Sequence, residues 1–231
     1  MKKILINIIC VTLFLFFLTG CSITDKKNEE ELMKEKTYTE MQFIEDAVFN
    51  ITNKYAKGEY IKDDDIEWDS ILDDEKKINE VLETIILDLS EMNISKENLV
   101  LLSNELNNLL AITINEDEEQ LIISLQKLYG LVPKFLNEFS DDKNSIKDKE
   151  LKEIVLLSFG FANIENWEES KININNAINK YNEMMNDVDY MKERSYSLNK
   201  VYVLLGEIKN AIESENLELV KLKFVNFIEK T

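Results

Sequence analysis

The chain of 231 residues has 45 acidic residues, 27 basic residues and no histidine, which gives a formal net charge of −18 at pH 7. Nucleic acids and anionic lipids are both held through basic side chains, so this composition excludes sequence-independent binding to either. The lack of histidine removes the commonest general base and the commonest metal ligand. Composition therefore excludes Ser/His/Asp, Cys/His and histidine-based zinc chemistry.

The first 21 residues have the three parts of a bacterial export signal. Lys2 and Lys3 form a basic start, residues 4–18 are apolar at all but two positions, and the tetrapeptide Leu-Thr-Gly-Cys ends at Cys21. This tetrapeptide resembles the lipobox of bacterial lipoproteins. The resemblance implies that residues 1–20 are removed and that Cys21 receives a diacylglyceryl group, whose two acyl chains suffice for stable anchoring.

Two other interpretations of this segment are open. As a helix, the 15 residues from 4 to 18 would span about 22 Å, which is short of the ~30 Å hydrocarbon core that a transmembrane anchor must cross. The other is an ordinary secreted protein with a free thiol at Cys21. If the protein is lipidated or secreted, Cys10 is removed with the signal. The mature chain then keeps one Cys and forms no internal disulfide.

The rest of the chain predicts an all-α fold after a polar, flexible tether over residues 21–36. From residue 37 onward apolar residues recur at helical spacing, as at Leu99, Leu102, Leu106 and Leu109. One proline and few glycines supply too little turn chemistry for an all-β fold. We expect about eight amphipathic helices, with a kink or break at residues 130–133, over 37–57, 68–92, 96–113, 116–139, 148–163, 166–188, 193–213 and 215–230.

Four junctions between these helices share short, polar, acidic turns of the kind that joins antiparallel helices. Alignment of Gly58, Asn115, Asn166 and Asn216 gives spacings of 57, 51 and 50 residues. These spacings suggest two duplicated four-helix halves, residues 37–140 and 141–231, arranged as a bundle or a short repeat array. Chance spacing in a helical chain is the alternative, and the sequence leaves open whether the halves share one core.

The segment from residue 102 to the end resembles an uncharacterised group of helical lipoproteins from Gram-positive bacteria such as clostridia. The similarity runs through Leu-Leu-Ala at 109–111, Asn-Glu-Asp at 115–117, Pro-Lys-Phe at 133–135 and Asn-Trp at 166–167. The resemblance implies a helical lipoprotein, and no activity of that group can be assigned to this chain. A weaker similarity to tetratricopeptide hairpins lacks their 34-residue period.

The densest acidic cluster, residues 63–69, has carboxylates at positions 1, 3, 5 and 7 of a calcium-type loop. Trp68 stands where that loop needs glycine, and Asp74 stands where it needs glutamate. We therefore interpret the cluster as a solvated loop with helix-capping aspartates and expect no metal site. Arg194, the one arginine, is expected in a surface ion pair.

Four aromatic residues are the candidates for ligand contact: Trp68, Tyr129, Phe135 and Trp167. Aromatic side chains at helical spacing more often pack in a core, and that interpretation stays open for all four. A ligand cleft, if present, is expected between the two halves near Pro133 and Trp167.

The sequence therefore favours a lipid-anchored, extracytoplasmic interaction or scaffold module with no enzymatic activity, no catalytic residue and no cofactor. Its expected partners are the membrane, through the anchor at Cys21, and either a protein or a small solute. The alternative function is a solute- or cation-binding lipoprotein whose site lies between the two halves. The ligand, the partner and the pathway are left open.

Overall fold

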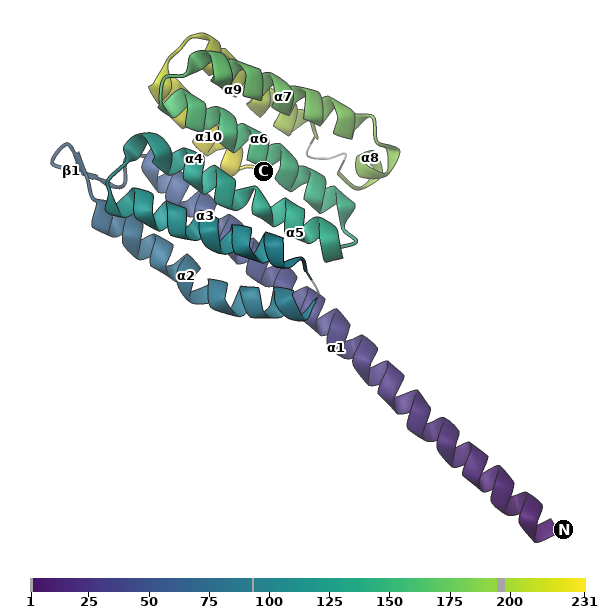
Figure 1. Cartoon of the computed structure of the whole chain (residues 1–231). Coiled ribbons are helices and arrows are strands. Elements are labelled where there is room, and N and C mark those ends of the chain that lie inside the picture. Colours follow the sequence, from purple (N-terminus) through teal and green to yellow (C-terminus); the bar gives the residue numbers. More distant parts are fainter. Residues whose placement is uncertain (1, 93, 195–197) are drawn as a thin grey trace.

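The computed structural model describes the backbone of residues 2–92, 94–194 and 198–231, and the side chains of 29–82, 84–92, 94–194 and 199–231. Over these residues the fold is all-α, as the sequence predicts, with one two-stranded hairpin (Figure 1). The helices are α1 (Lys2–Ala56), α2 (Trp68–Glu91), α3 (Lys96–Ile114), α4 (Glu118–Tyr129), α5 (Leu131–Phe139), α6 (Lys143–Asn163), α7 (Trp167–Met185), α8 (Val188–Arg194), α9 (Leu198–Glu213) and α10 (Leu217–Ile228). The hairpin strands are β1 (Ile61–Lys62) and β2 (Asp65–Ile66).

The helices pack as two adjacent rings of four. In the first ring, α1 to α4 each contact the next helix and α4 closes back on α1; in the second, α6, α7, α9 and α10 do the same. Helices α4 and α5 contact α6, and α1 contacts α10, so the rings lie side by side (Figure 1). The linker between α5 and α6 falls at the expected boundary near residue 140. Duplication of one ancestral half stays a prediction.

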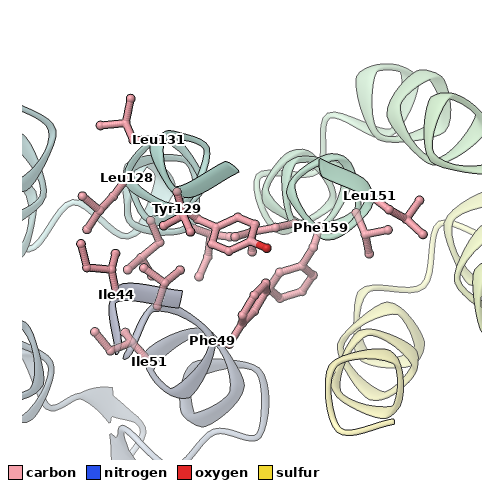
Figure 2. Close-up of a cluster of buried hydrophobic side chains, with 14 of the residues drawn as sticks. Ile44, Phe49, Ile51, Leu128, Tyr129, Leu131, Leu151 and Phe159 are labelled. Carbon is pink, nitrogen blue, oxygen red and sulfur yellow. The ribbon is translucent and has the colours of Figure 1, made fainter. Parts of the chain in front are cut away.

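The two rings share one hydrophobic core. Buried apolar side chains from both rings belong to a single contiguous cluster. Figure 2 shows Phe49 of α1, Tyr129 of α4 and Phe159 of α6 meeting at the centre of this cluster. The rings of Phe49 and Tyr129 pack edge to face with centroids 4.8 Å apart, and Phe159 stacks on Phe224 of α10 at 4.3 Å. The shared core resolves the question that the sequence left open.

The first helix is longer than expected. Residues 21–36 were predicted as an irregular tether, whereas their backbone continues α1 without a break, and the N-terminal part of α1 extends away from the rings (Figure 1). No glycine or proline occurs between residues 22 and 57, and Glu30 and Lys34 form an i,i+4 ion pair of 2.9 Å. Burial begins at Thr37 and continues at Met41, Ile44 and Val48.

The Cys21 side chain lies outside those that the structure describes, so its lipidation stays a prediction. Within the described part of the chain, no helix is both long and apolar enough to cross a membrane.

The expected break near Pro133 is present and lies at Gly130, which separates α4 from α5. A Cβ atom on Gly130 would lie 2.5 Å from Glu153 Oε1 of α6, so a larger residue there would require the flexible end of the Glu153 side chain to move. Pro133 occupies the first turn of α5, where a helix does not need its N–H. The helix expected over 193–213 begins at Leu198, and α8 forms a separate short helix before it.

Three junctions use the same two-residue turn. The first turn residue has positive φ, and its N–H donates to the carbonyl of the residue three positions earlier. The N–H of the second turn residue donates to the carbonyl of the residue five positions before it. This pair of hydrogen bonds is a Schellman motif. The second residue caps the following helix through its side chain. The turns are Glu116-Asp117, Glu165-Asn166 and Glu215-Asn216. The expected alignment was wrong by two residues at Asn115, because the residue equivalent to Asn166 and Asn216 is Asp117.

These turns place glutamate in a conformation that favours glycine. A non-glycine residue at φ 56°, the value at Glu165, destabilises the folded state by about 1–2 kcal/mol. Glycine removes this strain, but it also makes the unfolded chain more flexible, which cancels part of the gain in stability. We expect Glu165→Gly to raise the free energy of unfolding by about 0.5–1 kcal/mol in urea denaturation. Glu165→Ala, the control, keeps the Cβ and should give no gain; equal stabilisation by both variants would contradict the strain.

Candidate functional site

The four aromatic candidates do not come together. Tyr129 and Phe135 are 0% and 1% exposed inside the shared core, so neither offers an open face to a ligand. Trp68 and Trp167 are the first residues of α2 and α7, and both are partly buried against the same core. Tyr129 and Phe135 therefore pack in the core, whereas Trp68 lines a separate open hollow with Ile66 and Glu116. The four rings do not line one cleft, and ligand contact at Trp68 or Trp167 stays a prediction.

The acidic cluster at 63–69 forms the β-hairpin. Asp63 and Asp64 occupy its two-residue turn with φ of 53° and 73°, which is the backbone twist that suits a tight hairpin. Lys62 pairs with Asp65 in the ladder, and Lys62 Nζ lies 3.1 Å from Glu67 Oε1. Among the described side chains, no group of three carboxylates is placed to hold a metal ion.

A different site lies where the two rings meet. A hollow of about 280 Å³ is lined by Glu45 of α1, by side chains of α6 and α8, by Val201 of α9, and by Phe227 of α10 with the residues that follow it. We call it the inter-ring hollow. Its volume lies just below the range for small-molecule pockets, ~300–1,000 Å³. Its full lining is Glu45, Ser145, Asp148, Lys149, Leu151, Lys152, Tyr190, Arg194, Val201, Phe227, Lys230 and Thr231.

A buried ion pair forms one wall of this hollow. Lys149 of α6 donates to Glu45 of α1, and the two residues are only 6% and 7% exposed. Lys152 Nζ lies 3.4 Å from the other oxygen of Glu45 and 5.7 Å from the centroid of the Phe49 ring. This wall joins residues more than 100 positions apart in the chain, so it exists only when both rings are folded together.

Tyr129 supports this wall from inside the core. Its hydroxyl donates to the backbone carbonyl of Lys149 at 3.2 Å, which fixes the turn of α6 that carries the lysine. Burial raises the pKa of the Tyr129 hydroxyl well above its usual range, and the nearby Glu45 carboxylate adds to the rise. The sequence therefore singled out a residue beside the site and misjudged its role, since Tyr129 positions the wall and does not stack on a ligand.

A second charged group also lines the hollow. The Tyr190 hydroxyl of α8 donates to Asp148, and Arg194 Nε lies 3.4 Å from the other oxygen of Asp148. Burial raises the pKa of the Asp148 carboxyl, while the Tyr190 and Arg194 contacts oppose the rise. Burial and the Asp148 acceptor together raise the pKa of Tyr190. Arg194 thus forms an ion pair with a side chain that is 40% exposed, in agreement with the expected surface pair, although its Nε atom is buried.

The hollow has the opposite charge to the chain. Its lining carries four cationic side chains, Lys149, Lys152, Arg194 and Lys230, against two anionic ones, Glu45 and Asp148, which leaves two positive side-chain charges in excess. The whole chain has a net charge of −18. The lining also includes the apolar side chains of Leu151, Val201 and Phe227. The hollow can therefore accept a small molecule with both charged and apolar parts.

Comparison of the chain with protein-family models, with curated proteins and with solved structures found no match in any of the three. The resemblance to helical lipoproteins stays an expectation from the sequence, and the site is argued from its geometry.

A further perturbed carboxyl lies inside the first ring. Glu75 of α2 is 0% exposed, its Oε1 accepts from the Thr113 hydroxyl at 2.6 Å, and its Oε2 has no partner among the described atoms. Burial raises the pKa of Glu75 to about 7. Perturbed carboxyls are often functional, but this one is closed to solvent, so its consequence is for stability.

The pKa of Glu75 makes stability depend on pH. Because the folded pKa of about 7 exceeds the unfolded value of about 4.3, the folded state binds the proton more tightly. Protonated Glu75 therefore stabilises the folded state fully below the unfolded pKa, and this contribution to the free energy of unfolding is lost as pH rises through 7. The loss is about 4 kcal/mol at 1.36 kcal/mol per pKa unit.

We expect Glu75→Gln to be more stable than the parent at pH 8 by up to about 4 kcal/mol, and to differ from it by only about 1 kcal/mol at pH 5. Urea unfolding of both proteins at the two pH values measures this difference. Glu80→Gln, an exposed position on the same helix, is the control. A Glu75→Gln advantage of equal size at both pH values would contradict the raised pKa.

Proposed function

We propose that this chain is a lipid-anchored extracytoplasmic binding protein that holds a small solute in the inter-ring hollow. The observation that carries the proposal is the pair of charged walls, Glu45 with Lys149 and Asp148 with Arg194, that face one hollow. Buried ion pairs lose much hydration energy and add little net stability compared with apolar packing. Charged groups that lose hydration energy at a concave surface are typical of ligand sites.

This proposal reverses the order of preference that the sequence alone suggests. An interaction module needs an exposed apolar docking surface. The large exposed apolar side chains of the described residues are distributed over several helices, for example Leu87 on α2, Val100 on α3, Tyr202 on α9 and Leu222 on α10. The inter-ring hollow instead concentrates polar and apolar groups in one place, which favours solute binding.

The anchor part of the proposal depends on the N-terminal segment. The Leu-Thr-Gly-Cys tetrapeptide follows directly on the apolar run, where lipidation of Cys21 requires it. If residues 21–36 stay helical after processing, they extend about 24 Å at 1.5 Å per residue. That length would carry the rings clear of the bilayer surface.

Lipidation has a direct chemical test. In a bacterial host fed labelled palmitate, we expect the parent chain to incorporate label and to lose residues 1–20. Cys21→Ala should incorporate none and should keep its signal, because processing depends on the acylated thiol. The matched control is Cys10→Ala, which lies within the signal and should be labelled like the parent. Equal labelling of Cys21→Ala and the parent would refute the anchor.

Solute binding can be tested by thermal unfolding with a panel of neutral, cationic and anionic small molecules that includes Ca²⁺ and Mg²⁺. We expect at least one solute class to raise the Tm, because a ligand that binds only the folded state stabilises it. Ser145→Trp fills the hollow from α6 and should abolish the shift. The control Ser90→Trp adds the same side chain at an exposed position of α2 and should keep it.

Two results would contradict solute binding at this place. One is a flat response of the parent across the whole panel. The other is a Tm shift of equal size in the parent and in a folded Ser145→Trp variant, which would place the binding elsewhere.

A further inference from the structure

We propose that the solute is a small organic anion whose carboxylate or phosphate group lies against Arg194 and Lys152, with its apolar part against Leu151 and Val201. This inference rests on the proposed function and adds the chemical class of the ligand. It is carried by the composition and geometry of the inter-ring hollow, in which positive side-chain charge exceeds negative charge by two.

The cationic side chains of the lining differ in how tightly they are held by ion pairs within the protein. Lys149 is buried and held by Glu45, so it belongs to the wall. Lys152 lies at 3.4 Å from Glu45, which is a long contact, and its side chain keeps 20% exposure. It can therefore turn its ammonium toward an anion in the hollow while remaining close to Glu45.

Arg194 supplies the planar recognition group. Its side chain is 40% exposed and borders the hollow on the α8 side. A guanidinium presents five N–H donors in a rigid fork that matches the oxygens of a carboxylate or a phosphate. Asp148, accepting from Tyr190 and lying 3.4 Å from Arg194 Nε, holds this fork at the edge of the hollow.

The apolar lining selects an organic anion over a bare inorganic one. Leu151, Val201 and Phe227 contribute hydrocarbon to the same hollow. Leu151 and Phe227 are only 4% and 0% exposed, so Val201, which is partly buried, supplies most of the open hydrocarbon. A molecule with a short hydrocarbon body removes this surface from water, which adds binding energy in proportion to the area buried. The volume of about 280 Å³ limits the ligand to a small molecule.

The rest of the molecule makes this site specific. With a net charge of −18, the chain repels anions over most of its surface. A local excess of positive charge at one concave place is therefore the feature that an anion can recognise, and it also disfavours a cation of the same shape.

The test uses four ligands with one hydrocarbon body and different head groups: butyrate, butyl phosphate, butylammonium and 1-butanol, with inorganic phosphate as a fifth. Calorimetric titration of the full mature chain measures each dissociation constant. We expect butyrate or butyl phosphate to bind at least about tenfold more tightly than butylammonium and butanol, as charge-assisted hydrogen bonds predict. The comparison of these two anions, and of butyl phosphate with inorganic phosphate, distinguishes the head groups and the role of the hydrocarbon.

Three variants localise the interaction. Arg194→Gln should weaken the anion by about tenfold or more, whereas Lys192→Gln, an exposed lysine on the same helix, should change binding less than twofold. Asp148→Asn removes a negative charge from the hollow, while its amide oxygen can still accept from Tyr190 and keep Arg194 in place. This variant should therefore tighten anion binding. Because damage to the fold can only weaken binding, this change of opposite sign separates a charge effect from misfolding.

Each outcome bears on one of the two proposals. Tighter binding of butylammonium or butanol, abolished by Ser145→Trp, would overturn the anion inference and leave solute binding standing. Failure of all five probes while another solute of the wider panel binds at the hollow would also overturn the inference alone. A flat response to the probes and to the panel would overturn both.

Discussion

The ion pair between Glu45 and Lys149 is the contact on which the architecture of the site depends. It links α1 of the first ring to α6 of the second, and both side chains are nearly closed to solvent. Removal of one partner would leave an unpaired charge in the core, which costs several kcal/mol. The pair therefore fixes the relative position of the two rings at the place where the hollow forms. The edge-to-face contact of Phe49 with Tyr129 lies beside it and seals the same seam with apolar surface.

This arrangement explains why a chain so rich in carboxylates has a positive hollow. Most described lysines pair with acidic residues at the surface, many of them three or four positions away along one helix, such as Lys76 with Asp73. The lysines of α6 that face the seam are instead drawn to Glu45, a partner from the other ring. Because one carboxylate meets two ammonium groups there, positive charge accumulates where the rings meet.

Local features of the fold could be predicted from the sequence, whereas features that depend on distant contacts could not. The helices follow from apolar periodicity, and the break before Pro133 follows from the chemistry of glycine and proline. The glutamates with positive φ were missed because that conformation favours glycine or asparagine, which led the alignment to Asn115. The helical backbone of residues 21–36 was missed because polar composition was interpreted as a lack of order.

The candidate site could be predicted only in outline. The expectation of a site between two halves agrees with the position of the hollow, but the residues expected there were aromatic. No periodicity in the sequence indicates that Glu45 meets Lys149 or that Asp148 meets Arg194, because these contacts arise from the docking of one ring on the other. The signals that pointed toward them were the single arginine and the dense mixture of charges at the start of α6, neither of which identifies a partner.

The most direct measurement follows the stability and the solute binding of Glu45→Leu/Lys149→Met in the same samples, by urea unfolding and by calorimetric titration. Because apolar residues can replace a buried ion pair at little or no cost, the account predicts a folded variant at least about as stable as the parent. Its affinity for the solute should fall, because Lys152 loses the Glu45 contact that holds its ammonium group beside the hollow. A variant that keeps both its stability and the parent's affinity would contradict the claim that the charged seam is a binding site.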